Sequence, residues 1–139
     1  MSAGATTKTD CFFDTNIIVY LISPDSAKAS RSDALIEAGG TVSVQVLNEF
    51  ATVARRKFQM DWSSANLILA TVKANCAVVP LTLETHTRGI AYAERYRLAI
   101  YDSMIVAAAV IAGCTTLYSE DMHDGLVVDG VTVRNPYRV

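Results

Sequence analysis

The feature that most constrains the fold of this 139-residue chain is the alternation of short apolar runs with longer segments of helical periodicity. The short runs are rich in branched and aromatic residues, and they predict strands over 11–13, 41–44, 77–81 and 115–118, with a last strand or hairpin over 127–133. In the longer segments apolar residues recur every three or four positions, which predicts helices over 17–21, 28–37, 45–57, 62–72, 84–96 and 101–112. Strands that alternate with helices form a mostly parallel sheet covered on both faces, so we expect an α/β fold.

The composition agrees with one globular domain. Hydrophobic residues make up 51% of the chain and charged residues 19%, which provides for a core and argues against disorder. Residues 1–9 are small and polar and lack the apolar centre of a signal peptide, so we expect a disordered arm followed by one domain over 10–139. The sequence predicts no membrane span. Three widely separated cysteines are expected to be buried thiols in a reducing cytoplasm: Cys11, Cys76 and Cys114.

Four acidic residues lie where such a fold would bring them together. Asp14 directly follows the first predicted strand, and Asp121 follows the strand over 115–118 within three residues. Asp102 lies at the start of the apolar helix that precedes that strand, and Glu49 lies at the border of the apolar face of its helix. Sites in open α/β sheets form at the carboxyl ends of the strands. The four acids are therefore candidates for one shared site.

Each of these acids also has an ordinary structural explanation. Asp14 and Asp102 are favourable helix caps, Glu49 suits a solvated helix flank, and Asp121 suits a polar loop. Their joint placement favours a shared site, and carboxylates that meet in one crevice need protons or a cation because they repel one another. Oxygen ligands without a cluster of His or Cys indicate Mg²⁺ or Mn²⁺.

The same acids belong to four stretches that carry a family resemblance. In the first stretch, Phe12–Asn16, an apolar strand ends in Asp-Thr-Asn, and in the second, Val46–Phe50, Glu49 is the acid. The third is Tyr101–Ser103 before an alanine-rich helix, and the fourth is Ser119–Met122 with the tail that follows it through Asp124, Gly125 and Asn135–Tyr137. Their order resembles that of PIN-domain nucleases, and the last stretch with its tail resembles VapC-like toxins. The resemblance covers about residues 9–139.

The resemblance implies both a fold and a site. The fold would be a three-layer α/β/α sandwich with a mostly parallel central sheet. The site would bind one or two Mg²⁺ or Mn²⁺ ions through the four acids, with Asp14 and Asp102 as direct ligands and Asp121 next. Glu49 would bind metal or accept a proton from the attacking water. The resemblance also assigns auxiliary roles to five neighbouring residues: Thr15, Asn16, Ser119, Glu120 and Asp124.

The function expected from this resemblance is that of a metal-dependent endoribonuclease, the toxin of a toxin–antitoxin pair. The partners would be RNA, a cognate antitoxin and a second copy of the chain in a homodimer. Such an antitoxin would pack an apolar helix into a groove and place an Arg over the acidic site. The mean hydropathy of +0.27 agrees with a buried association surface, for which the apolar segments over 17–22 and 62–72 are candidates, although both segments also suit packing on the sheet.

Contacts to a nucleic acid would have to come from local patches, because the net charge of −2 provides no general electrostatic attraction to phosphate. The basic cluster over 55–57 ends the helix that carries Glu49, and it is equally consistent with a favourable charge at a helix carboxyl end. Three tyrosines are candidates for stacking on bases, although core packing explains them as well: Tyr92, Tyr96 and Tyr101.

Rival functions leave different residue patterns. A PIN-type nuclease of RNA maturation or DNA processing would use the same acids and is the main alternative. A non-catalytic magnesium-binding signalling module would need paired acids after the first strand, but Phe13 precedes Asp14, and no lysine follows Lys73. A phosphatase with an Asp-x-Asp nucleophile motif would need an acid where Asn16 stands. Both of these alternatives are disfavoured.

Overall fold

The computed structural model describes residues 10–138, so the disordered arm predicted over 1–9 lies outside the described residues. Its centre is a six-stranded sheet with the strand order β3-β2-β1-β4-β6-β5. All neighbouring strands are parallel except β5 and β6, which form an antiparallel hairpin. The mostly parallel sheet predicted from the sequence is confirmed. The strands are β1 (Cys11–Phe13), β2 (Gly40–Ser43), β3 (Cys76–Val79), β4 (Thr116–Tyr118), β5 (Val127–Val128) and β6 (Val131–Arg134).

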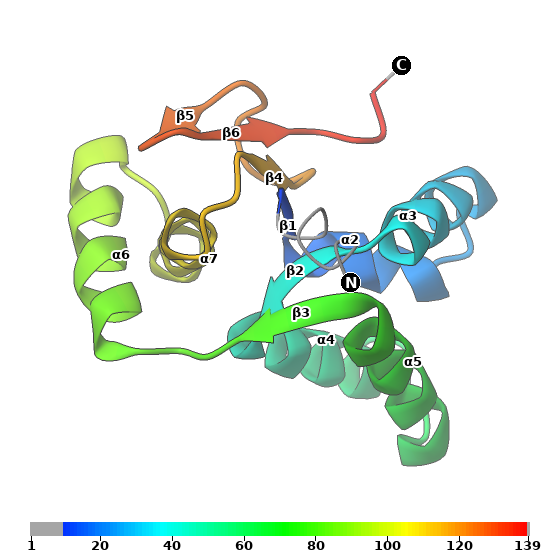
Figure 1. The fold of residues 1–139 in the computed structure, drawn as a ribbon. Coiled ribbons are helices and arrows are strands. Elements are labelled where there is room, and N and C mark those ends of the chain that lie inside the picture. Colours follow the sequence, from blue (N-terminus) through cyan, green and yellow to red (C-terminus); the bar gives the residue numbers. More distant parts are fainter. Residues whose placement is uncertain (1–9, 139) are drawn as a thin grey trace, which may run out of the picture.

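Helices cover both faces of this sheet and make it the middle of three layers. On one face α7 packs against β2, β4 and β6, and α6 packs against the outer side of α7 (Figure 1). On the opposite face α2 and α3 lie beside the sheet, and α5 contacts α3, α4 and β3 (Figure 1). This arrangement confirms the predicted α/β/α sandwich. The helices are α2 (Thr15–Val19), α3 (Ser26–Ala38), α4 (Val44–Arg56), α5 (Trp62–Asn75), α6 (Leu83–Tyr96) and α7 (Ile100–Ile111).

Most helices begin where a side chain caps the first turn. Asp25 accepts a hydrogen bond from the backbone N–H of Lys28, and Asp61 accepts one from the backbone N–H of Ser64. Ser43 caps α4 in the same way, so β2 passes into α4 without a loop and Val44 belongs to the helix instead of the predicted strand. The predicted strand over 77–81 ends at Val79, before Pro80, which has no backbone N–H to donate.

The core forms on both faces of the sheet. Phe12 and Phe13 in β1 are fully buried, and α7 is buried along most of its length because it lies between the sheet and α6. The first predicted helix, over 17–21, lies two residues earlier in the structure, because α2 begins after its cap Asp14, ends at Val19 and is followed by a 3-10 turn, η1 (Tyr20–Ile22). Ile17 and Ile18 are fully buried in this core. They therefore cannot supply the association surface considered for 17–22.

The second candidate for an association surface, the segment over 62–72, is partly exposed. In the segment over 62–72, Trp62 is 59% exposed and Leu67 is 68% exposed, whereas Val72 is fully buried. This segment therefore keeps apolar side chains on its outer face.

Within residues 10–138, no helix is both long and apolar enough to cross a membrane.

Candidate active site

The four predicted acids come from four different elements that meet near the carboxyl edge of the sheet. Asp14 directly follows β1, and its backbone N–H donates to the carbonyl of Tyr118 at the end of β4 (3.0 Å). Asp121 lies in the loop after β4, Glu49 in the second turn of α4, and Asp102 in the first turn of α7. The parallel pairing of β1 with β4 places the residues after both strands side by side.

Asp14 is the most buried of the four acids, with only 3% of its surface exposed. The backbone N–H of Thr15 donates to Oδ1 (2.7 Å), so Asp14 caps α2, while the hydroxyl of Ser119 donates to Oδ2 (2.7 Å). Burial raises the pKa of Asp14 from 3.8 to about 6 because it disfavours the charged carboxylate. Asp102 and Asp121 raise it further, and the hydrogen bonds from Ser119 and Thr15 oppose the rise. Asp14 is thus both a helix cap and a buried, poorly compensated acid.

Asn16 and Ser119 connect Asp14 with Asp121. The side-chain amide of Asn16 donates to Oδ2 of Asp14 and to Oδ2 of Asp121, at 3.1 Å each. The hydroxyl of Ser119 accepts hydrogen bonds from the backbone N–H groups of Asp121 and Met122, at 3.2 Å each. These contacts fix the loop after β4 relative to the start of α2. They place two of the predicted auxiliary residues directly against the acids.

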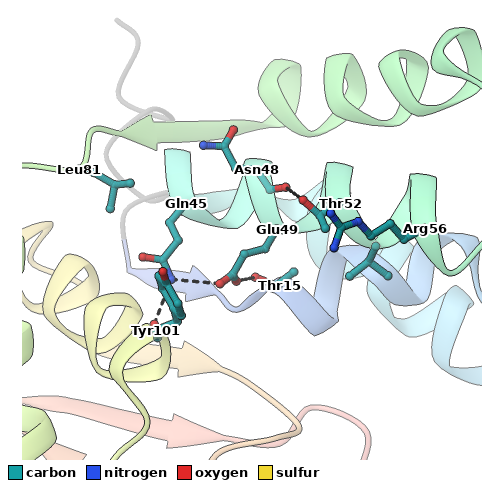
Figure 2. Close-up of a pocket in the computed structure, with 9 residues that line it drawn as sticks. Thr15, Gln45, Asn48, Glu49, Thr52, Arg56, Leu81 and Tyr101 are labelled. Carbon is teal, nitrogen blue, oxygen red and sulfur yellow. Dashed lines mark hydrogen bonds between the residues drawn. The ribbon is translucent and has the colours of Figure 1, made fainter.

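Glu49 is held from both sides by hydrogen bonds. The hydroxyl of Thr15 donates to Oε1 (2.5 Å), and the side-chain amide of Gln45 donates to Oε2 (3.3 Å). Gln45 also donates to the backbone carbonyl of Tyr101 (3.0 Å), so it joins α4 to the first turn of α7 (Figure 2). The sequence analysis missed Gln45, although its position one helical turn before Glu49 places both side chains on the same helix face.

Asp102 completes the acidic group. It is the third residue of α7. The residue at the cap position is Ala99, which has no side chain that can cap the helix, so Asp102 is not the cap that the sequence allowed. Its pKa is raised, mainly by burial and then by the charges of Asp121 and Glu49. Among the ion pairs formed by residues 10–138, none includes any of the four acids. Their negative charge is therefore not neutralised by a basic side chain of the described protein.

The donor chemistry of this group fits a hard divalent cation. Carboxylate and hydroxyl oxygens are the ligands that Mg²⁺ and Mn²⁺ prefer, and the raised pKa of Asp14 reflects a site that disfavours unpaired negative charge. In the part of the chain that the structure describes, no three His, Cys, Asp or Glu side chains already form a set of metal ligands. The amide of Asn16 lies between Asp14 and Asp121 instead. The four acids therefore suit a divalent metal ion, because their carboxylates are negatively charged and offer oxygen atoms as ligands.

The two auxiliary acids form other contacts. Glu120 forms an ion pair with Lys28 of α3 and accepts a hydrogen bond from the hydroxyl of Tyr20. Burial works against its charge, but these two hydrogen bonds outweigh burial and lower the pKa of Glu120. Asp124 accepts a hydrogen bond from the backbone N–H of Asn135 (2.8 Å) and holds the C-terminal segment. Both acids are therefore compensated within the protein.

A pocket of about 810 Å³ opens beside Glu49 between α4 and the start of α7. Its lining residues include Thr15, Gln45 and Glu49, together with Tyr101, Leu81 and Arg56 (Figure 2). Its volume lies in the range of about 300–1,000 Å³ that is common for small-ligand sites. Glu49 is therefore accessible from solvent through this pocket.

Comparisons with known proteins agree with this architecture. The model of the PIN domain family matches residues 11–123, and a comparison with curated protein sequences gave no significant match. Among solved structures, a toxin–antitoxin complex from Klebsiella pneumoniae aligns with a TM-score of 0.70 and 22% identity, covering 93% of this chain and 99% of that chain. VapC20 of Mycobacterium tuberculosis, described as a sarcin–ricin loop cleaving toxin, aligns with a TM-score of 0.64 and 18% identity, covering 80% of this chain and 89% of that chain. At such identities the two structures support the fold, and the family match extends over most of the sequence. The chain belongs to the PIN domain family.

Proposed function

We propose that this protein is a metal-dependent endoribonuclease and the toxin of a toxin–antitoxin pair. The observation that carries the proposal is the group of Asp14, Glu49, Asp102 and Asp121, which come from four elements and have no basic partner among the described residues. The family match and the likeness of the fold to two toxin structures support it. A scaffold without catalytic activity would have no need to keep this charge uncompensated near a buried carboxyl group.

The residues of the site have separable roles in this proposal. Asp14, Asp102 and Asp121 would hold one or two Mg²⁺ or Mn²⁺ ions, and bound metal would activate water and stabilise charge on the phosphate oxygens. Glu49 accepts a proton from the attacking water, in an orientation that Thr15 and Gln45 fix. Ser119 and Asn16 hold Asp14 and Asp121 in place. Attack of this water on phosphorus would break the bond to the ribose 3′-oxygen, which takes up a proton from solvent and leaves as a 3′-hydroxyl, while the other product keeps a 5′-phosphate.

A cleavage assay tests the enzymatic part of the proposal. Purified protein is incubated with single-stranded RNA and with DNA of the same sequence, in Mg²⁺ or Mn²⁺ and in EDTA. We expect cleavage of RNA only when metal is present, with 5′-phosphate and 3′-hydroxyl ends on the products. Cleavage of DNA in preference to RNA would favour the alternative of a DNA-processing nuclease. An absence of cleavage with either metal would contradict the proposal.

Expression in a bacterial host tests the toxin part. We expect growth arrest when the chain is expressed alone, and recovery when the product of the neighbouring gene is expressed with it. Harmless expression of a folded, active enzyme would favour a nuclease of RNA maturation instead. We also expect the protein to form a homodimer. The exposed apolar residues on α5 are one candidate for the dimer interface. Light scattering that shows only a monomer would contradict this expectation.

A further inference from the structure

Two pockets adjoin at the acidic group. The first is the pocket beside Glu49 described above, here named the Tyr101 pocket. The second has a volume of about 330 Å³, is lined by Asn16, Asp121 and Lys57, among others, and is here named the Lys57 pocket. Thr15 and Val53 line both pockets, so the two are neighbours across the surface of α4. Glu49 lines the first pocket and Asp121 the second, so each pocket contains one of the four acids.

Each pocket has one basic side chain without an ionic partner. Arg56 lines the Tyr101 pocket and reaches back along α4 toward Thr52 (Figure 2), while Lys57 lines the Lys57 pocket. Within residues 10–138, neither side chain forms an ion pair. Arg55 differs because it donates to the carbonyl of Met60 (2.7 Å), whereas the contact of Lys57 is with the ring of Phe58 at 5.6 Å. The end of α4 therefore provides an available positive charge on each side of the acids.

Each pocket also has an aromatic wall. Tyr101 is 67% exposed and lines the first pocket together with Leu81, which is 48% exposed. The other two candidate tyrosines are occupied elsewhere, since the hydroxyl of Tyr92 donates to Asp129 (2.5 Å) and Tyr96 packs against the core. In the second pocket the aromatic residues, Tyr20 and Phe58, are half-buried, and the Tyr20 ring packs edge-on against Tyr137. Tyr101 is therefore the exposed ring of the two pockets, and an exposed aromatic ring near a cation is a combination that binds the bases and phosphates of single strands.

We propose that an unpaired RNA strand crosses the contact between α2 and α4 at Thr15 and Val53, so that nucleotides on opposite sides of the scissile phosphate occupy the Tyr101 pocket and the Lys57 pocket. This inference rests on the proposed nuclease function. Arg56 and Lys57 contact the flanking phosphates, and Tyr101 stacks on a base. The strand is unpaired because bases within a duplex are stacked on one another and cannot reach an aromatic side chain. Metal bound by the acids would offset the charges of Glu49 and Asp121, so the phosphates on either side of the scissile bond can pair with Arg56 and Lys57.

Kinetics on a short fluorescent single-stranded RNA that the wild-type protein cleaves provide the first test. Arg56→Gln and Lys57→Gln should each raise KM and reduce the salt dependence of binding by about 0.7 in the log–log slope, as expected for one lost phosphate contact. Tyr101→Ala should raise KM by about 10-fold, and Tyr101→Phe should restore it, because the stacking face is kept. In all three variants kcat should stay near the wild-type value.

Lys73→Gln is the matched control, because Lys73 is an exposed lysine on α5 that lines neither pocket. It should change neither KM nor the salt slope. Unchanged KM in Arg56→Gln and Lys57→Gln, from a protein that still cleaves RNA, would overturn the proposed path and leave the nuclease function intact.

Crosslinking tests the two-sided arrangement without depending on cleavage. The Asp102→Asn protein is bound to RNA with 4-thiouridine placed either before or after the cleavage position. One label should crosslink near Tyr101 and the other near Tyr20 or Phe58. Labels that crosslink to one common pocket, or outside both pockets, would overturn the path.

Two-sided crosslinks to a protein whose wild type cuts no RNA in Mg²⁺ or Mn²⁺ would support the path and contradict the nuclease function. A protein partner that occupies both pockets while RNA crosslinks to neither would assign this surface to protein binding instead.

Discussion

At the scale of single residues, the burial of Asp14 governs the chemistry of the site. This carboxyl group lies 3% exposed at the end of β1, and burial raises its pKa to about 6. The hydroxyl of Ser119 and the backbone N–H of Thr15 favour the ionised form but do not fully offset burial. A neighbouring cation would stabilise the carboxylate and lower this pKa. Without metal, Asp14 is therefore a source of instability at neutral pH.

The first prediction concerns this pH dependence. Between the ordinary pKa of 3.8 and the raised value of about 6, folded protein retains a proton that the unfolded chain has already lost. The free energy of unfolding in EDTA should therefore decrease as the pH rises through this window, by on the order of 3 kcal/mol in total. The raised pKa of Asp102 acts in the same direction. Thermal melts across this range should show the decrease, and Asp14→Asn should reduce it.

The control for this series is Glu94→Gln, which removes an exposed carboxylate on α6. Its pH dependence should equal that of the wild type. If Asp14→Asn and wild type had parallel stability curves between these two pKa values, the raised pKa of Asp14 would be wrong.

The second prediction concerns Ser119. Ser119→Ala removes the donor to Asp14 and leaves the backbone N–H groups of Asp121 and Met122 without their acceptor. We expect a loss of about 1–3 kcal/mol of stability. The pH profile of RNA cleavage should also move to higher pH, because Ser119 lowers the pKa of Asp14. The matched variant is Ser103→Ala, a buried serine whose hydroxyl donates to Ile100 (2.7 Å), and it should leave the pH profile in place.

At the scale of the elements, the site depends on how closely β1 and β2 pack. Gly40 begins β2, and a Cβ atom built there would lie 2.5 Å from the ring of Phe13 and 2.9 Å from Sγ of Cys11. The adjacent Phe13 is fully buried, so its ring has little room to move. This glycine therefore allows β2 to pair closely with β1, whose last residue is followed directly by Asp14.

The third prediction compares two glycine substitutions. Gly40→Ala should cost about 1–3 kcal/mol because the buried ring of Phe13 must shift. Gly89→Ala on α6 should cost less, although its Cβ would lie 2.4 Å from Sδ of Met104, because the end of a methionine side chain can move. Alanine also favours a helix over glycine by about 1 kcal/mol. Thermal melts should place Gly40→Ala below Gly89→Ala, and the reverse order would contradict the packing described for β1 and β2.

At the scale of the whole molecule, the sequence predicted the parts of the site that have local signals. Asp14 could be located because an apolar strand ends in Asp-Thr-Asn, and the fold could be predicted because strand and helix patterns alternate along the chain. Contacts between distant segments left no such signal. The ion pair of Glu120 with Lys28 joins residues 92 positions apart, so the sequence does not indicate that this acid has a basic partner. Arg55 and Arg56 are neighbours in the sequence, but Arg55 donates to the carbonyl of Met60 and Arg56 lines the Tyr101 pocket. This difference depends on the direction of each side chain from α4, which the sequence does not indicate.

If the acids of this site hold metal for RNA cleavage, the loss of one metal ligand in Asp102→Asn should lower the cleavage rate in Mn²⁺. This substitution removes one charge from the site and keeps nearly the same shape, and Glu94→Gln on α6 provides the matched loss of an exposed charge. We predict that Asp102→Asn lowers the rate on single-stranded RNA by on the order of 100-fold or more while the protein stays folded. Glu94→Gln should cleave at the wild-type rate. Cleavage by folded Asp102→Asn at the wild-type rate would contradict the account.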